Sequence, residues 1–102
     1  MVRGLDTVRT LDRLRARRDD TLQITAARGA RNVRIFGSVA RGTARHDSDV
    51  DLLVQMEPGR TALDLSELIL DLEEALGRAV DVVEIPHPTP AVERLLRKAV
   101  PL

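Results

Sequence analysis

The chain has 102 residues, 43% of them hydrophobic, no cysteine and a formal net charge of zero, with 11 of its 16 basic residues in residues 1–46. This length allows one compact core rather than two, and the lack of cysteine excludes disulfides and thiolate metal sites. Phe36 is the only aromatic residue, and no apolar segment is long enough to span a bilayer or form a signal peptide. We therefore expect one cytoplasmic domain over residues 1–102, with no membrane contact and no direct nucleic-acid binding.

The first predicted elements lie before residue 43. Apolar residues recur at helical spacing at Leu5, Val8, Leu11 and Leu14 and, after a charged stretch at 15–20, again up to Ala27. This pattern predicts one long or two short helices that end near Gly29. Residues 33–36 favour a strand that stops at Gly37. A short helix is expected next, with Ser38 as its N-cap and Gly42 as its C-terminal stop.

The second part of the chain contains two further strands and two helices. Residues 49–54 change from alternating acidic and apolar to wholly apolar, as expected for a buried strand whose first residues reach a cleft. After a Pro-Gly turn, a helix is predicted from Thr61 to Gly77, with its apolar face formed by Leu65, Leu68, Ile69, Leu72 and Leu76. Residues 80–85 favour a third strand. A last helix is predicted from Thr89-Pro90, with its apolar face at Val92, Leu95, Leu96, Ala99 and Val100.

The order of these elements is helix, strand, short helix, strand, helix, strand, helix. Such an order is typical of an α/β fold. We expect a small mixed sheet of three strands, or slightly more, flanked by about four helices. Functional residues should lie where strand ends meet loops.

Three aspartates are candidates for a metal site. Asp49 and Asp51 are two residues apart on one strand, so their side chains leave the same face with Cα atoms ~7 Å apart. Oxygen ligands of this kind suit Mg²⁺. Asp81 lies in an otherwise apolar strand and could complete a site for two ions roughly 4 Å apart. The alternatives are a solvated strand start for the first two aspartates and a water-facing edge-strand residue for Asp81.

Gly37 and Ser38 follow the first predicted strand and are candidates for a phosphate site. A glycine there allows close approach of the backbone to a ligand, and the serine offers a hydroxyl and an N–H group at a helix N-terminus. A Gly-Ser pair is common in turns, so the pair carries weight only together with the aspartates.

Taken together, residues 36–42 (FGSVARG) and 48–54 (SDVDLLV) form a longer motif: Gly-Ser, ten intervening residues, then Asp-x-Asp. This motif resembles the signature of the nucleotidyltransferase superfamily related to DNA polymerase beta. The Ala-Arg-Gly after Gly-Ser and the Ser before Asp49 are most similar to the subgroup called minimal nucleotidyltransferases.

The resemblance implies that Asp49, Asp51 and Asp81 bind two Mg²⁺ ions and are catalytic. It also implies that Gly37 and Ser38 hold the triphosphate of ATP, and that Arg41 braces the motif loop or approaches phosphate. In this subgroup the partner is often a HEPN-type toxin, and the resemblance implies an antitoxin that transfers AMP to a toxin tyrosine.

Two other functions fit the same sequence. A non-catalytic antitoxin could neutralise its partner by contact alone, through the basic N-terminal helix or through an acidic face at Asp64, Glu67, Asp71 and Glu74. A small-molecule nucleotidyltransferase could instead modify a hydroxyl group, for example that of an antibiotic.

Overall fold

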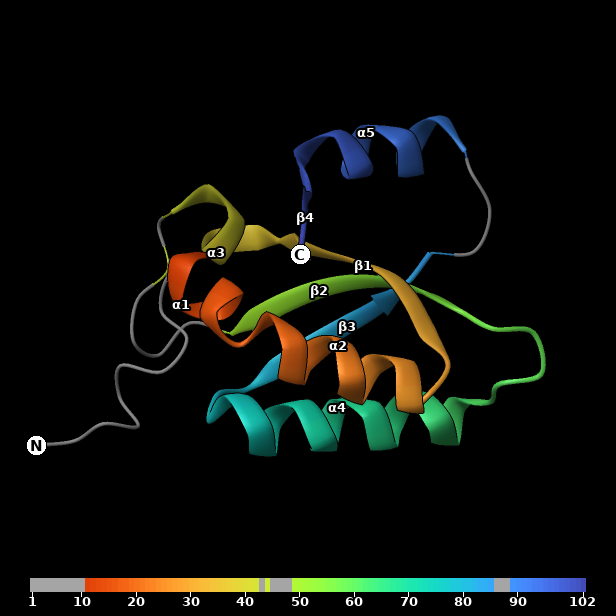
Figure 1. The fold of residues 1–102 in the computed structure, drawn as a ribbon. Coiled ribbons are helices and arrows are strands. Elements are labelled where there is room, and N and C mark those ends of the chain that lie inside the picture. The colour runs from red at the N-terminus through yellow and green to blue at the C-terminus, as the bar shows by residue number, and fades with distance from the viewer. Residues whose placement is uncertain (1–10, 43, 45–48, 86–88) are drawn as a thin grey trace, which may run out of the picture.

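The computed structural model describes residues 11–42, 44, 49–85 and 89–102, which form five helices and four strands in one α/β arrangement (Figure 1). The helices are α1 (Leu11–Ala16), α2 (Arg18–Ala27), α3 (Gly37–Arg41), α4 (Ala62–Leu76) and α5 (Pro90–Lys98). The strands are β1 (Ala30–Phe36), β2 (Val50–Met56), β3 (Val80–Glu84) and β4 (Val100–Pro101). The predicted mixed sheet with flanking helices is confirmed.

The four strands lie in the order β3-β2-β1-β4. Strand β1 is antiparallel to β2 and to β4, whereas β2 and β3 are parallel. A parallel pair requires a crossover connection, and α4 provides it between β2 and β3. This crossover brings the beginnings of β2 and β3 to the same end of the sheet, close to where β1 ends and α3 begins.

Helices α2 and α4 lie on one face of the sheet and α5 lies on the other (Figure 1). The core between the sheet and helices α2 and α4 consists of aliphatic side chains. On α4, Leu68, Leu72 and Leu76 recur every four residues and are fully buried. Between these two helices, Arg28 at the end of α2 forms ion pairs with Glu67 and Asp71 of α4. Helix α5, in contrast, has no fully buried residue.

Three predicted helix boundaries are confirmed. Thr61 caps α4, and its backbone N–H donates to Asp64 Oδ2 at 2.9 Å to complete a capping box. Gly77 ends the same helix in the left-handed conformation. Thr89 caps α5 by accepting a hydrogen bond from the backbone N–H of Val92 at 3.2 Å, and Pro90 occupies the first helical position.

The prediction for the end of the last helix was wrong. Ala99 and Val100 were assigned to its apolar face, but α5 ends at Lys98 and Val100 belongs to β4, where it pairs with Ile35. The physical reason is Pro101, because a proline disfavours helical geometry in the residue before it. The sheet therefore gains a short fourth strand at its edge.

Two other boundaries also differ from the prediction. Phe36, rather than Ser38, is the N-cap of α3, so Ser38 lies within the first turn of that helix. The N-terminal segment, predicted as one long or two short helices, forms the two short helices α1 and α2. Leu5 and Val8, which the prediction included, lie outside the described residues. Of the helices described, none combines the length and apolar character needed to cross a membrane.

Candidate functional site

The connection from β1 to α3 places Gly37 against the carboxylate of Asp51. Gly37 has a φ of +75°, a conformation that residues with a side chain rarely adopt. A Cβ atom built on Gly37 would lie 2.2 Å from Asp51 Oδ2, far inside van der Waals contact. Glycine is therefore required here both by the turn and by the position of the Asp51 carboxylate.

Asp51 and Asp81 are register partners on the parallel strands β2 and β3. Side chains alternate between the two faces of a strand, and the neighbours of Asp51, Val50 and Leu52, are fully buried toward α2 and α4. Asp51 therefore projects from the opposite face, and Asp81 does so too. Neighbouring strands are ~4.8 Å apart, so the two carboxylates leave the sheet side by side.

Asp81 is an exposed residue on an edge strand. The sequence left two interpretations of Asp81 open, a third carboxylate of the site and a water-facing residue of an edge strand. The alternative, a water-facing edge residue, describes its exposure correctly. Its register opposite Asp51 places its side chain on the same face of the sheet as that of Asp51.

Asp49 and Arg41 act on the same carboxylate. Asp49 is exposed immediately before β2, and Arg41 is exposed in the last turn of α3. Partial burial raises the pKa of Asp51 above its usual value, and the negative charges of Asp81 and Asp49 raise it further, whereas the positive charge of Arg41 lowers it. Two carboxylates and one guanidinium thus lie close enough to Asp51 to shift its pKa.

This donor set suits a divalent cation. A cation that binds beside Asp51 would neutralise the negative charges around it, and Mg²⁺ is usually held by one or two carboxylates together with water and substrate phosphates. Among the residues that the structure describes, no three acidic or histidine side chains converge closely enough to enclose an ion. Asp51 and Asp81 supply the one or two carboxylates that Mg²⁺ uses when water and phosphate provide its other ligands.

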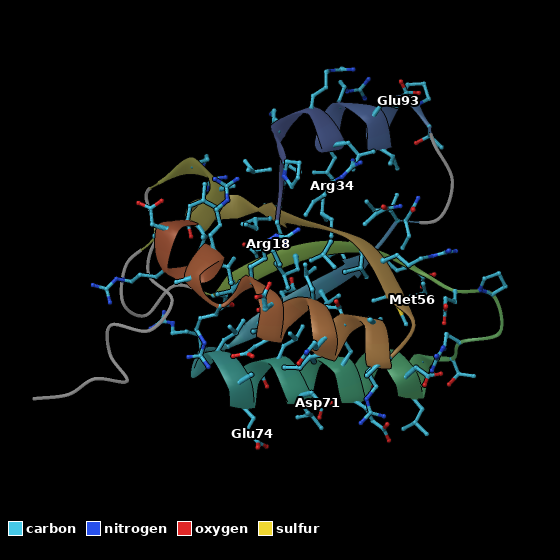
Figure 2. The ribbon with its side chains drawn as sticks, in the orientation of Figure 1. Arg18, Arg34, Met56, Asp71, Glu74 and Glu93 are labelled. Carbon is cyan, nitrogen blue, oxygen red and sulfur yellow. The ribbon has the colours of Figure 1, made fainter. Side chains whose placement is uncertain are left out.

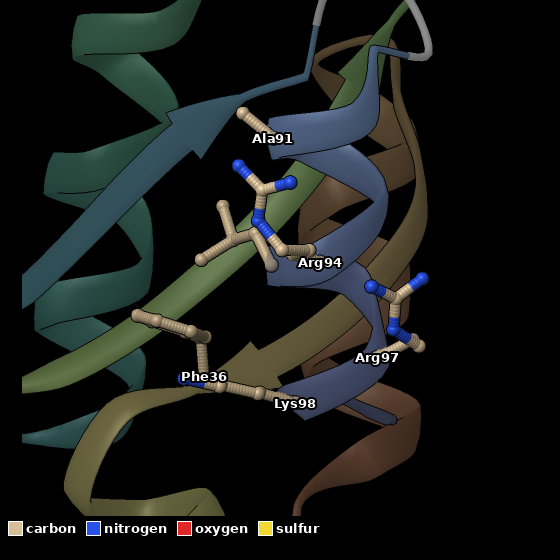
Figure 3. A pocket seen from close by; sticks show the side chains of 6 residues that line it. Phe36, Ala91, Arg94, Arg97 and Lys98 are labelled. Atoms are coloured by element: carbon tan, nitrogen blue, oxygen red, sulfur yellow. The ribbon is translucent and has the colours of Figure 1, made fainter.

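A pocket beside this site was not predicted. It measures about 400 Å³ and is lined by Phe36 of β1 and by five residues of α5 (Figure 3): Ala91, Arg94, Leu95, Arg97 and Lys98. The signal in the sequence was the spacing of Arg94, Arg97 and Lys98 at i, i+3 and i+4, which places three cations on neighbouring positions of a helix.

Comparison with known proteins gives a consistent result. The nucleotidyltransferase domain family matches residues 18–100. A Methanocaldococcus jannaschii protein assigned as a protein adenylyltransferase is 39% identical over 80 residues, which cover 78% of this chain and 86% of that protein. The protein adenylyltransferase MntA of Thermococcus cleftensis is 47% identical over 55 residues, which cover 54% of this chain and 56% of that protein.

Solved structures show the same fold. A protein described as a minimal nucleotidyltransferase superposes with a TM-score of 0.79 and 53% identity, covering 91% of this chain and 96% of its own. A toxin–antitoxin crystal structure with AMP-PNP superposes with a TM-score of 0.64 at 21% identity, over 76% of this chain and 64% of its own, and at that identity shows the fold alone. The family match, the sequence identity and the fold agree. The chain therefore belongs to the nucleotidyltransferase domain family.

Proposed function

We propose that this protein is an antitoxin that transfers AMP from ATP to a tyrosine hydroxyl of a HEPN-type toxin, in the cytoplasm where ATP is available. The observation that carries the nucleotidyl-transfer step is the register pairing of Asp51 with Asp81 beside Gly37. This arrangement presents two adjacent carboxylates on one face of the sheet, next to the Gly-Ser turn. Metal-bound triphosphates are held by groups of this kind.

In this proposal Asp49, Asp51 and Asp81 would hold two Mg²⁺ ions, whose chemistry would be to lower the pKa of the acceptor hydroxyl and to neutralise charge on the phosphates. Gly37 and Ser38 approach the triphosphate, and Arg41 moderates the negative charge around Asp51. The acceptor oxygen forms a bond to the α-phosphorus while the bond between that phosphorus and the oxygen of the departing pyrophosphate breaks. The hydroxyl proton passes to solvent. The protein contributes mainly position and charge to this displacement.

The protein acceptor is proposed from the relatives. Two of them carry the name protein adenylyltransferase, and a similar fold occurs in a toxin–antitoxin crystal structure with a nucleotide analogue. The tyrosine and the HEPN character of the toxin come from the resemblance to minimal nucleotidyltransferases noted above.

A labelling experiment tests the proposed transfer. The protein is incubated with ATP labelled at the α-phosphate, Mg²⁺ and the HEPN-type toxin encoded beside it. We expect label on the toxin with wild type and none with Asp51→Asn. Toxin in which the acceptor tyrosine is replaced by phenylalanine serves as the substrate control. Equal labelling by wild type and Asp51→Asn would end the proposal.

The structure weakens one form of the binding-only alternative. Of the four acids assigned to an acidic face of α4, Glu67 and Asp71 form ion pairs with Arg28. Asp64 belongs to the capping box and lies 3.5 Å from Arg60 Nη1. These partners neutralise much of the negative charge on which a docking surface for a basic partner would depend. Figure 2 shows Asp71 and Glu74 on the side of α4 that faces away from the sheet.

A further inference from the structure

The pocket between β1 and α5 combines an apolar floor with a cationic rim. Phe36, Ala91 and Leu95 supply the apolar surface, and three cations line the remainder: Arg94, Arg97 and Lys98. Its volume of about 400 Å³ lies in the range of small-molecule sites. A ligand that fits this lining has a flat apolar part and several negative charges.

The three cations differ from several other basic residues in their surroundings. Within the described part of the chain, none of them forms a hydrogen bond or an ion pair with a carboxylate. Two other arginines differ in this respect, since Arg28 pairs with Glu67 and Asp71, and Arg60 pairs with Glu57 at 3.1 Å. Arg94 and Lys98 are four residues apart on α5, and their positive charge favours an anionic ligand.

The pocket adjoins the carboxylates of the candidate site. Phe36 is the register partner of Asp51 in the antiparallel β1–β2 ladder, and it immediately precedes Gly37. Cα atoms of such partners are roughly 5 Å apart, and their side chains leave the same face of the sheet. A ligand that packs on Phe36 therefore has its other groups within reach of Asp51.

The C-terminal end of α5 is held in place by β4. Val100 pairs with Ile35, the residue before Phe36, so the chain positions Lys98 close to Phe36. The end of the chain is anchored further by Arg18, whose Nε donates to the backbone carbonyl of Leu102 at 2.9 Å. In Figure 3 the Lys98 side chain extends toward Phe36, whereas Arg97 points to the other side of α5.

We propose that this pocket is the subsite for the nucleoside triphosphate, with the base packed on Phe36 and Leu95 and the phosphates bound by Arg94 and Lys98. The inference rests on the proposed nucleotidyl transfer and assigns α5 to substrate binding. Stacking on an aromatic ring suits any nucleobase because every base has a π-face. Arg94 and Lys98 bring positive charge to the side of the triphosphate that the carboxylates do not reach.

The test is calorimetric binding of ATP to the full chain in the presence of Mg²⁺. We expect Lys98→Ala and Arg94→Ala each to raise the Kd for ATP by about three- to tenfold, the scale of one exposed charge-assisted hydrogen bond. Glu93→Ala, on the same helix outside the pocket, and Arg31→Ala, an exposed cation at the far end of β1, should bind like wild type. Thermal unfolding of every variant confirms that the fold is intact.

Binding of inorganic triphosphate distinguishes the contribution of the apolar floor from that of the cations. Phe36→Leu should weaken ATP binding but leave the Kd for inorganic triphosphate unchanged, whereas Lys98→Ala should weaken both. Unchanged ATP binding by the α5 variants, in a wild type that binds ATP and transfers AMP, would overturn this inference and leave the proposed function standing. Loss of toxin binding with an unchanged Kd for ATP would also overturn it, because the pocket would then dock the partner. A wild type that binds no nucleotide would overturn both.

Discussion

Asp51 and Asp81 face each other across the parallel strands β2 and β3, so that two like charges leave the same face of the sheet at the same level. Such a pair destabilises the fold when both residues are ionised, by about 0.2–1 kcal/mol for directly opposed like charges. The arrangement is useful only if a ligand neutralises it. Stability and activity are therefore expected to move in opposite directions at this position.

The first prediction concerns Asp51→Asn. In the absence of divalent cations we expect its free energy of unfolding to exceed that of wild type by about 0.2–1 kcal/mol, because the partly buried charge and its repulsion from Asp81 and Asp49 are removed. Urea denaturation followed by circular dichroism measures the difference. Glu74→Gln, at an exposed position of α4, controls for loss of one negative charge and should change little. A less stable Asp51→Asn would contradict the repulsion.

A second prediction concerns the pH dependence of that difference. The pKa of Asp51 is raised in the folded state above its ordinary value of 3.8, so between these two values the folded protein binds more protons than the unfolded chain. Wild type therefore loses stability as pH rises through the folded pKa, and Asp51→Asn does not. The stability advantage of the variant should be small below pH 3.8, grow above it and level off by neutral pH. Urea titrations at several pH values measure this, and an advantage that shrinks with rising pH would be the wrong sign.

Gly37 offers a third prediction with a matched control in the same chain. Gly37 and Gly42 both have a φ of +75°, but a Cβ atom on Gly42 would meet nothing within 4 Å. Gly42→Ala should therefore cost only the backbone strain, about 1–2 kcal/mol. Gly37→Ala should cost more, because its Cβ also displaces the carboxylate of Asp51. Denaturation of both variants gives the two free energies of unfolding.

The excess cost at Gly37 should depend on Asp51. In the background of Asp51→Ala, the cost of Gly37→Ala is expected to fall toward that of Gly42→Ala, because the overlapping oxygen is gone. Equal costs in both backgrounds would mean that the two residues are not coupled.

A fourth prediction concerns the tether of α5. Removing residues 100–102 deletes β4 and the hydrogen bond from Arg18 to Leu102. The sheet formed by β1, β2 and β3 keeps its contacts, and so does α4. We expect a folded protein in which α5 is no longer held beside Phe36, with the Kd for ATP raised about tenfold. Calorimetry and circular dichroism measure the two properties. A shortened chain with wild-type affinity would show that β4 does not position α5.

Much of the fold could be predicted because local signals agree with the tertiary structure. The apolar spacing of α4, with Thr61 at one end and Gly77 at the other, fixes that helix without any long-range information. Strands β2 and β3 are similarly marked by their aliphatic residues. Val100 was assigned to a helix because its apolar character fits either state, and only Pro101 decides between them.

The candidate site was predictable to a different degree. Asp49 and Asp51 are linked by their spacing, which sequence alone reveals, whereas the pairing of Asp81 with Asp51 depends on the register of two strands joined by a crossover. The pocket at Phe36 depends on a contact between residues still farther apart in the sequence, the pairing of β4 with the edge of β1. Its cations could be seen in the sequence, but the face of the sheet to which they are brought could not.

The most direct measurement is the rate of AMP transfer by Asp81→Asn, compared with Glu84→Gln on the same strand. Glu84 lies opposite Val54 rather than opposite a carboxylate, so it provides a charge-matched control. With Mg²⁺ and labelled ATP, we predict that Asp81→Asn slows transfer by about 100-fold or more, as expected when a group that stabilises transferring phosphate is lost, while Glu84→Gln stays near wild type. Transfer by Asp81→Asn at the wild-type rate would contradict the account.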